Sequence, residues 1–280
     1  MHQPPASIQS TSSKLRRLVI IAATAIFAVW LLAIIYLWFW QESVLFHPEP
    51  TAADYTFDLP DTREIYLEVP GAKLHALYLR QPAEKSRGIV LFLHGNAGNL
   101  QTWFTHADFW LDTGYDVLMP DYRGFGKSSG HIESEAQLHE DTLRAWNLVA
   151  ADYSDKKRVI YGRSLGTGLA TKLASEVSAD LLVLVSPYVS MTQIAREYYP
   201  WVPHQLLRYP LRSDLLLPKV RSKILLIHGT EDKVINIEHS RHLQKLNPKA
   251  QLLEIPQAAH NDIHNFDIYT DTLANALKSL

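Results

Sequence analysis

The sequence contains no cysteine, which excludes disulfide bonds, thiolate metal ligands and a cysteine nucleophile. It also lacks a basic block, because 27 Lys and Arg residues face 29 Asp and Glu residues and the net charge is −2. A nucleic-acid partner is therefore not expected. His, Asp and Glu show no metal-ligand spacing. The glycine-rich stretch at 121–130 lacks the spacing of a phosphate-binding loop. We therefore expect neither a metal nor a cofactor.

The first 40 residues lack acidic side chains altogether, and residues 18–40 lack any charge. Leu18 to Trp40 is a run of 23 residues whose only polar side chain is Thr24. At about 1.5 Å per residue, such a helix spans a hydrocarbon core of about 30 Å. The run therefore predicts one transmembrane helix.

The flanking charges predict the orientation of this helix. Lys14, Arg16 and Arg17 precede the run and Glu42 follows it. The positive-inside rule places residues 1–17 in the cytoplasm and the rest of the chain across the membrane, which is the periplasm in a bacterium. A cleaved signal peptide is the alternative, but its apolar region is usually shorter, about 7–15 residues. We expect an uncleaved signal anchor at 18–40, preceded by a disordered polar tail at 1–13.

The remainder reads as a linker over 41–61 and one α/β domain over 62–280. Alternating residues at 63–69 and 73–79, separated by Pro70-Gly71, predict an antiparallel hairpin. Continuous apolar runs at 88–95, 116–124, 158–164, 181–187, 223–229 and 251–256 are typical of strands buried in a parallel sheet. Helical patterns at 134–152, 165–177, 237–246 and 261–280 alternate with them. This order predicts a doubly wound, mostly parallel sheet.

Ligands of such sheets bind beyond the carboxyl ends of the strands, where polar residues of this sequence gather. Ser164 lies there within Gly162-Arg-Ser-Leu-Gly166, a G-x-S-x-G motif between a buried strand and a helix. This context is that of a nucleophile elbow, in which a sharp turn exposes the serine hydroxyl. Gly162 and Gly166 leave space where a larger side chain would crowd the turn. The alternative is a serine that merely caps the helix.

A serine hydroxyl needs a base, and the chain order of this arrangement is Ser, acid, His. Asp232 follows the strand at 223–229, and His260 follows the last strand. We predict that His260 accepts the proton of Ser164 and that Asp232 orients His260. The rival residues nearby are Glu231, His264 and His242.

Attack by the serine would create an oxyanion, which needs hydrogen-bond donors. The backbone N–H of Leu165, at the start of the following helix, is one candidate. The N–H of Asn96, in the loop after the strand at 88–95, is the other. His94 and His228 precede glycines at strand ends, and we interpret both as structural residues.

With these motifs in place, the sequence resembles the alpha/beta-hydrolases over about residues 60–280. More narrowly, it resembles a membrane-anchored branch that carries HGNAGN, YRGFGKSSG and GRSLG, here at 94–99, 122–130 and 162–166. The resemblance implies Ser164 as nucleophile, Asp232 as acid and His260 as base, with Asn96 and Leu165 at the oxyanion hole. One departure is Ala258, where the family often has glycine. Esterases, lysophospholipases and protein deacylases belong to the family.

Residues 188–220 lie where this fold inserts its cap, and they are rich in tyrosine and leucine. The segment either packs on the sheet or forms an apolar lid that lines an acyl pocket. The sequence thus predicts a membrane-anchored serine hydrolase acting on esters or thioesters of small or lipid-like acyl substrates. A serine peptidase on the same fold and a non-catalytic membrane scaffold are the alternatives.

Overall fold

A computed structural model describes residues 9–280, with side chains from Ser13 onward. It contains two compact units, one ending at Leu45 and the other comprising Phe46–Leu280. The first unit consists of α1 (Gln9–Phe39) and α2 (Gln41–Leu45). Within α1, Ser13–Phe39 is long and apolar enough to cross a membrane, with a mean hydropathy of 2.9 over its 18-residue window. A signal sequence near the N-terminus meets the same criteria of length and hydropathy.

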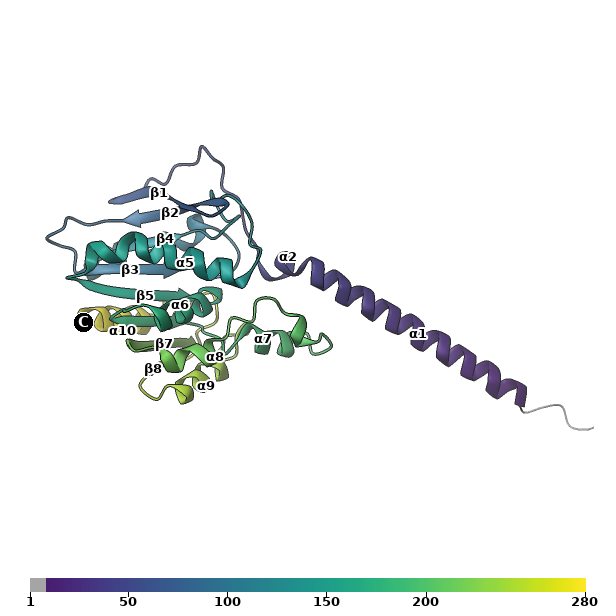
Figure 1. Ribbon diagram of the computed structural model, residues 1–280. Helices are drawn as coiled ribbons and strands as arrows, with labels where there is room; N and C mark the ends of the chain where they lie inside the picture. Colours follow the sequence, from purple (N-terminus) through teal and green to yellow (C-terminus); the bar gives the residue numbers. More distant parts are fainter. Residues whose placement is uncertain (1–8) are drawn as a thin grey trace, which may run out of the picture. The chain divides into compact units, whose positions relative to one another are not determined.

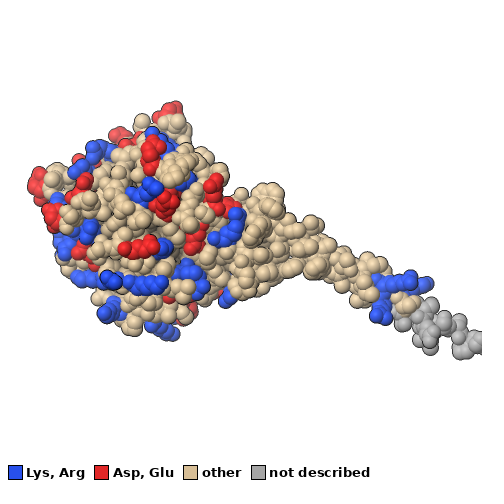
Figure 2. Space-filling model, viewed as in Figure 1, with Lys and Arg blue, Asp and Glu red and all other residues tan. Residues whose placement is uncertain are grey.

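The beginning of α1 differs from the expected disordered tail. Residues 9–13 are helical, whereas residues 1–8 lie outside the described residues. A helix already nucleated by an apolar run adds one hydrogen bond for each further residue, which favours this extension. Figure 2 shows basic side chains near the beginning of α1 and an uncharged surface along the rest of the helix.

The second unit is built on an eight-stranded sheet with the order β1-β2-β4-β3-β5-β6-β7-β8. The strands are β1 (Thr62–Val69), β2 (Ala72–Leu79), β3 (Gly88–Leu93), β4 (Tyr115–Pro120), β5 (Lys157–Arg163), β6 (Leu181–Val185), β7 (Lys223–Gly229) and β8 (Gln251–Ile255). The β1/β2 and β2/β4 pairs are antiparallel, and the remaining pairs are parallel. The predicted alpha/beta-hydrolase fold with an N-terminal antiparallel hairpin is confirmed.

Helices cover both faces of this sheet (Figure 1). One face carries α5 (Glu135–Ala150), α6 (Leu165–Glu176), α8 (Ser213–Leu216) and α9 (Glu238–Leu246). The other carries α4 (Ala107–Thr113) and α10 (Asp267–Lys278), with α3 (Leu100–Trp103) in the loop before α4. Buried residues of β3, β4, β5 and β6 form a core with side chains of α4 and α10. Strands buried on both faces explain the continuous apolar runs.

Several local predictions need adjustment. The helix expected at 261–280 begins only at Asp267, because residues 263–265 form a 3-10 turn in which Asp262 accepts hydrogen bonds from Ala259 N–H and Asn265 N–H. The short helices α3 and α4 carry no strong periodic signal and were not predicted. Ser134 does cap α5, since its hydroxyl accepts a hydrogen bond from Gln137 N–H.

Candidate active site

Ser164 lies at a sharp turn between β5 and α6, with φ 51° and ψ −118°. A non-glycine residue with positive φ is strained and persists only where its surroundings hold it. The flanking glycines allow the required close packing. A Cβ added at Gly166 would lie 2.1 Å from Leu93 O, and one at Gly162 would lie 2.6 Å from Gly166 O. The turn therefore holds the serine on top of the sheet, as the motif predicts.

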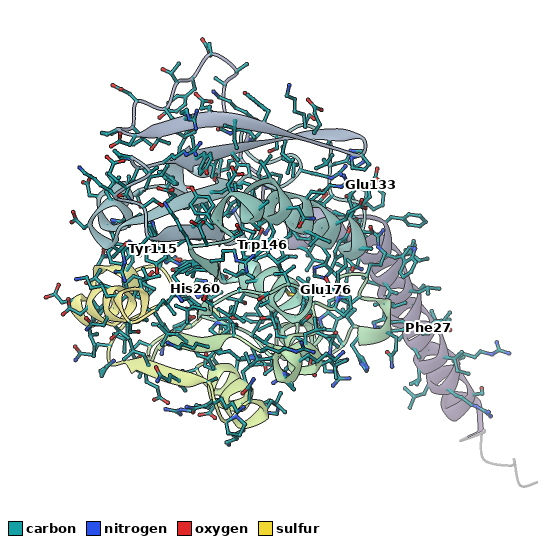
Figure 3. The ribbon with its side chains drawn as sticks, turned by 60° about the vertical axis from the view of Figure 1, so that its left-hand side comes forward. Phe27, Tyr115, Glu133, Trp146, Glu176 and His260 are labelled. Carbon is teal, nitrogen blue, oxygen red and sulfur yellow. The ribbon has the colours of Figure 1, made fainter. Side chains whose placement is uncertain are left out.

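The structure brings the three sequence-predicted residues into one hydrogen-bonded chain. Ser164 Oγ lies 3.0 Å from His260 Nε2. His260 Nδ1 lies 2.7 Å from Asp232 Oδ2. His260 is part of the loop between β8 and α10, which brings it over the end of β5 (Figure 3). This geometry lets the imidazole hold one proton toward Asp232 while its other nitrogen faces the hydroxyl.

The rival residues do not join this chain. Glu231 forms an exposed ion pair with Lys233. His264 lies 3.4 Å from a guanidinium nitrogen of Arg163. His242 is exposed on α9. Ala258, the departure from the family pattern, is fully buried against Gly229, so its methyl group fits the core.

Asp232 is buried and remains ionised because several donors surround it. Its Oδ1 accepts hydrogen bonds from Val234 N–H at 2.9 Å and Ile235 N–H at 2.8 Å. Its Oδ2 also lies 3.3 Å from His228 Nε2. Burial by itself would raise the pKa of Asp232, but the contacts to His228, His260 and Ile235 outweigh burial and hold this pKa well below its ordinary value.

The loop after β3 lies beside Ser164 and carries the expected oxyanion residue Asn96. A Cβ added at Gly95 would lie 3.3 Å from Ser164 Cβ. Ala97, with φ 64°, adopts a strained backbone conformation, and Gly98 follows with φ 76°. Leu165, the other expected donor, is the first residue of α6. The two sequence-predicted oxyanion residues thus lie on either side of Ser164.

Residues 47–51, which we call the strap, brace this loop. His47 N–H donates to Asn96 Oδ1 at 3.1 Å, and Glu49 N–H donates to Gly98 O at 3.2 Å. Asn99 Nδ2 donates in turn to Glu49 O at 3.0 Å. The strap belongs to the region expected to be a featureless linker. The strap contributes only backbone groups to these three hydrogen bonds, so its own side chains leave no pattern in the sequence.

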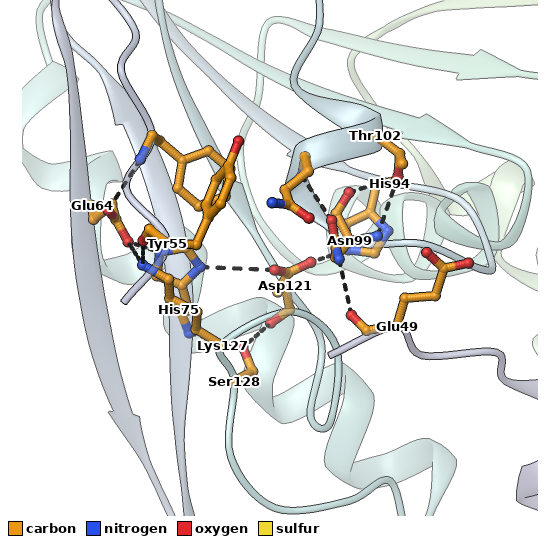
Figure 4. Close-up of polar contacts among 12 residues, drawn as sticks. Glu49, Tyr55, Glu64, His75, His94, Asn99, Thr102, Asp121, Lys127 and Ser128 are labelled. Carbon is orange, nitrogen blue, oxygen red and sulfur yellow. Dashed lines mark hydrogen bonds and ion pairs between the residues drawn. The ribbon is translucent and has the colours of Figure 1, made fainter. Parts of the chain in front are cut away.

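A buried network of ionisable side chains lies on the other side of the same loop (Figure 4). His94 Nε2 lies 3.4 Å from Asp121 Oδ1, and His75 Nδ1 lies 3.8 Å from Asp121 Oδ2. His75 Nε2 continues to Glu64 Oε2 at 2.9 Å, and Glu64 is paired with Lys127. Burial would raise the pKa of Asp121, but the two imidazoles outweigh burial and hold this pKa below its ordinary value.

His94 is fixed by this network and by its aromatic neighbours. Its ring lies 4.3 Å from that of Tyr122 and 5.8 Å from that of Trp103, centroid to centroid. Its carbonyl accepts a hydrogen bond from Tyr122 Oη–H at 2.7 Å. Because His94 directly precedes Gly95 and Asn96, these contacts fix the start of the oxyanion loop.

The insert at 188–220 forms α7 (Met191–Tyr198), α8 and two 3-10 turns, His204–Leu206 and Leu217–Lys219. Tyr209 and Leu217 are fully buried, so part of the insert packs on the domain. Tyr198, Tyr199 and Trp201 are exposed. The structure thus shows packing by one part of the insert and an uncovered aromatic surface on another.

Two contributors to the site were not identified from the sequence. His228 contacts the acid Asp232, and the only signal is their separation of four residues across a strand end. Arg163 Nη2 donates to His260 O at 3.2 Å, although a residue next to the nucleophile carries no pattern of its own. Among residues 9–280, no group of three or more His, Asp or Glu side chains is placed to hold a metal ion.

Comparison with known proteins identifies the family. The family model described as "Serine aminopeptidase, S33" matches residues 84–215. The alpha/beta hydrolase domain-containing protein 17C of Xenopus tropicalis is 33% identical over 195 residues, which cover 67% of this chain and 61% of that protein. An uncharacterized protein of Mycobacterium tuberculosis is 30% identical over 241 residues, covering 82% and 83% of the two chains.

The chain belongs to the alpha/beta-hydrolase superfamily. The match spans about three fifths of the length of the 17C relatives. Solved structures of the same fold include an esterase of Pyrococcus furiosus, with a TM-score of 0.66, 22% identity and coverage of 83% of this chain and 98% of that one. A thioesterase domain from the curacin biosynthetic pathway has a TM-score of 0.58 and 17% identity, with coverage of 78% and 99%.

The lowered pKa of Asp121 predicts an acid-sensitive contribution to stability. A carboxyl whose folded pKa lies below its unfolded value of about 4 stabilises the fold above that pH, and this stabilisation is lost as the pH falls through the folded pKa. Asp121→Asn should therefore lower Tm most at pH 7, where the free energy of unfolding should fall by about 3 kcal/mol. The decrease in Tm should be smallest near pH 3. Thermal denaturation between pH 3 and pH 7 measures this difference.

Asp112→Asn, at an exposed site on α4, is the control. A Tm difference for Asp121→Asn that does not vary with pH would contradict the assignment.

Proposed function

We propose that this alpha/beta-hydrolase is a membrane-anchored serine hydrolase that cleaves carboxylic esters or thioesters through an acyl-enzyme intermediate. The observation that carries the proposal is the continuous hydrogen-bonded chain from Ser164 to His260 to Asp232, with distances of 3.0 Å and 2.7 Å. A serine that merely capped α6 would bond the helix backbone, and Ser164 makes no such side-chain cap.

The proposed mechanism follows from these contacts. His260 accepts the hydroxyl proton as Ser164 Oγ attacks the carbonyl carbon, and the imidazolium that forms is stabilised by ionised Asp232. The backbone N–H groups of Leu165 and Asn96 donate to the developing oxyanion. His260 then protonates the leaving alcohol or thiol, and a water activated by the same imidazole releases the acid. The contacts that lower the pKa of Asp232 keep its carboxylate ionised throughout the reaction.

A serine peptidase is the second candidate, because the matching family model is described as a serine aminopeptidase. The esterase and thioesterase structures of the same fold support ester chemistry instead. The two reactions share the nucleophile and differ in the leaving atom. Matched substrates, such as the p-nitrophenyl ester and the p-nitroanilide of one acyl group, therefore separate them.

Ser164→Ala should reduce ester hydrolysis by at least a thousandfold, because the variant lacks the hydroxyl proposed to form the acyl-enzyme. The rate on p-nitrophenyl butyrate and covalent labelling by a fluorophosphonate would be measured for both proteins. Labelling of the wild type but not of the variant is expected. Turnover of alanine p-nitroanilide by the wild type, abolished in Ser164→Ala, would favour the peptidase. A wild-type protein that neither labels nor turns over any substrate would indicate a scaffold.

Asn96→Ala should lower kcat by less than about tenfold. The side chain bonds His47 of the strap, so its loss removes one hydrogen bond of about 1 kcal/mol while the backbone donor remains. Loss of an oxyanion donor itself costs about 10²–10³ in kcat. Steady-state kinetics on a butyrate ester distinguish the two cases, with the exposed neighbour Gln101→Ala as control. A drop beyond a hundredfold would assign the oxyanion role to the side chain.

We further propose that α1 anchors the protein in the membrane with the hydrolase domain on the far side from the cytoplasm. The support is the helix Ser13–Phe39 and the basic residues near its beginning. An epitope after Leu280 should then be digested by protease added to the outer face of spheroplasts, and an epitope before Met1 should be protected. The reverse pattern would invert the orientation. Recovery of a soluble chain lacking α1 would indicate a cleaved signal sequence.

A further inference from the structure

A cavity of about 500 Å³ lies against the sheet face covered by α4 and α10, next to the catalytic centre. This volume falls within the range of about 300–1,000 Å³ found for small-molecule sites. Its walls come from four parts of the chain: Glu49 of the strap, the loop and helices at 96–110, the ends of β3, β4 and β5, and residues 261–273.

The floor of the cavity is apolar because of the register of the sheet. Phe92 of β3 pairs with Tyr161 of β5, so both side chains point to the same face. Met119, Trp110 and Leu273 complete the floor. The hydroxyl of Tyr161 is bonded to that of Tyr269 at 2.6 Å, so this polar pair is satisfied without a ligand. The floor therefore offers a ligand mainly ring faces and methylene groups.

The mouth of the cavity is polar and adjoins the catalytic residues. Asn96 carries the proposed oxyanion donor, Arg163 directly precedes Ser164, and Asn261 directly follows His260. The Arg163 guanidinium is held by His260 O at 3.2 Å and lies 5.2 Å from the Trp103 ring centroid. Burial, Arg163 and His106 together lower the pKa of His264 at this rim, so its ring is uncharged at neutral pH.

Gly95 lets this mouth open beside the nucleophile. A Cβ added at Gly95 would meet the Trp103 ring at 2.6 Å and Ser164 Cβ at 3.3 Å. Trp103, which lines the cavity, is therefore separated from Ser164 only by this glycine. A substrate carbonyl at Ser164 Oγ can place its ester group among the polar residues and its hydrocarbon against the apolar floor.

We propose that this cavity is the acyl pocket and that it takes a straight aliphatic chain of about eight to sixteen carbons. The upper length assumes that each carbon of the chain occupies about the 30 Å³ that one water molecule takes up in the liquid. This inference rests on the proposed serine hydrolase function. It differs from the sequence-based hypothesis of a pocket lined by the insert at 188–220, because none of the cavity-lining residues comes from that insert. The lining comes instead from α3, α4 and α10.

A chain-length series on the full-length protein tests the pocket. Values of kcat/KM on p-nitrophenyl esters should rise by up to about fourfold per added methylene, and at least 50-fold from acetyl to the optimum. Ala107→Phe adds a ring at the cavity wall and should lower the ratio of dodecanoyl to acetyl turnover at least tenfold. Asp108→Phe places the same ring at the exposed neighbouring residue, which does not line the cavity. This variant should leave that ratio within twofold. Thr270→Phe repeats the test from α10 if Ala107→Phe does not fold.

Binding to a catalytically silent protein separates this inference from the proposed chemistry. Trp103 and Trp110 line the cavity, so a brominated dodecanoate should quench tryptophan fluorescence of Ser164→Ala. Adding Ala107→Phe to that variant should weaken binding at least tenfold, whereas adding Asp108→Phe should not. Quenching without ester turnover by the wild type would support the pocket and contradict the hydrolase. Turnover that is insensitive to chain length, that prefers benzoyl esters, or that responds equally to both phenylalanine variants would overturn the acyl pocket.

Discussion

The close approach of β3, β5 and the start of α6 is the constraint on which the rest of the site depends. Gly166 lies so near Leu93 O that a single added methyl group would fall 2.1 Å from it, and one added at Gly162 would fall 2.6 Å from Gly166 O. This packing holds Ser164 in a backbone conformation that it would not adopt alone. It also puts the loop after β3 beside the serine. The proposed nucleophile and its surroundings are thus positioned by backbone contact, before any side-chain chemistry is considered.

Two further sets of contacts hold the loop that carries Asn96. The strap at 47–51 bonds it on one side through backbone groups. The network centred on Asp121 holds His94 on the other side through a buried carboxylate. Buried ionic groups contribute to stability only when they are fully paired, so this network is sensitive to protonation. Asp232 is a second buried carboxylate, at the opposite end of the site. Backbone N–H groups and two imidazoles keep it ionised.

Successive residues of β5 face opposite sides of the sheet, and this separates the two functions proposed for this region. Gly162 faces α6 and permits the tight turn, whereas Tyr161 and Arg163 face the side of α4 and α10 and line the cavity. One strand therefore supplies the nucleophile turn on one face and part of the proposed acyl pocket on the other. The polar mouth and apolar floor match the two ends of an acyl ester.

The sequence alone determined the fold class, the apolar N-terminal helix and the residues proposed for catalysis. Buried parallel strands give continuous apolar runs, a membrane-length helix gives an uncharged run, and Gly162, Ser164 and Gly166 occur at fixed spacing; these are local patterns. Only the tertiary structure decided the strap, the Asp121 network, the contact of His228 with Asp232, and the location of the cavity. The strap, the network and the cavity join segments far apart in the chain, whereas the contact of His228 with Asp232 spans four residues and depends on how the chain turns at the end of β7. The rise of α3 and α4 above the sheet, which opens the cavity beside Arg163, follows from packing in three dimensions and leaves no periodic trace in the order of residues.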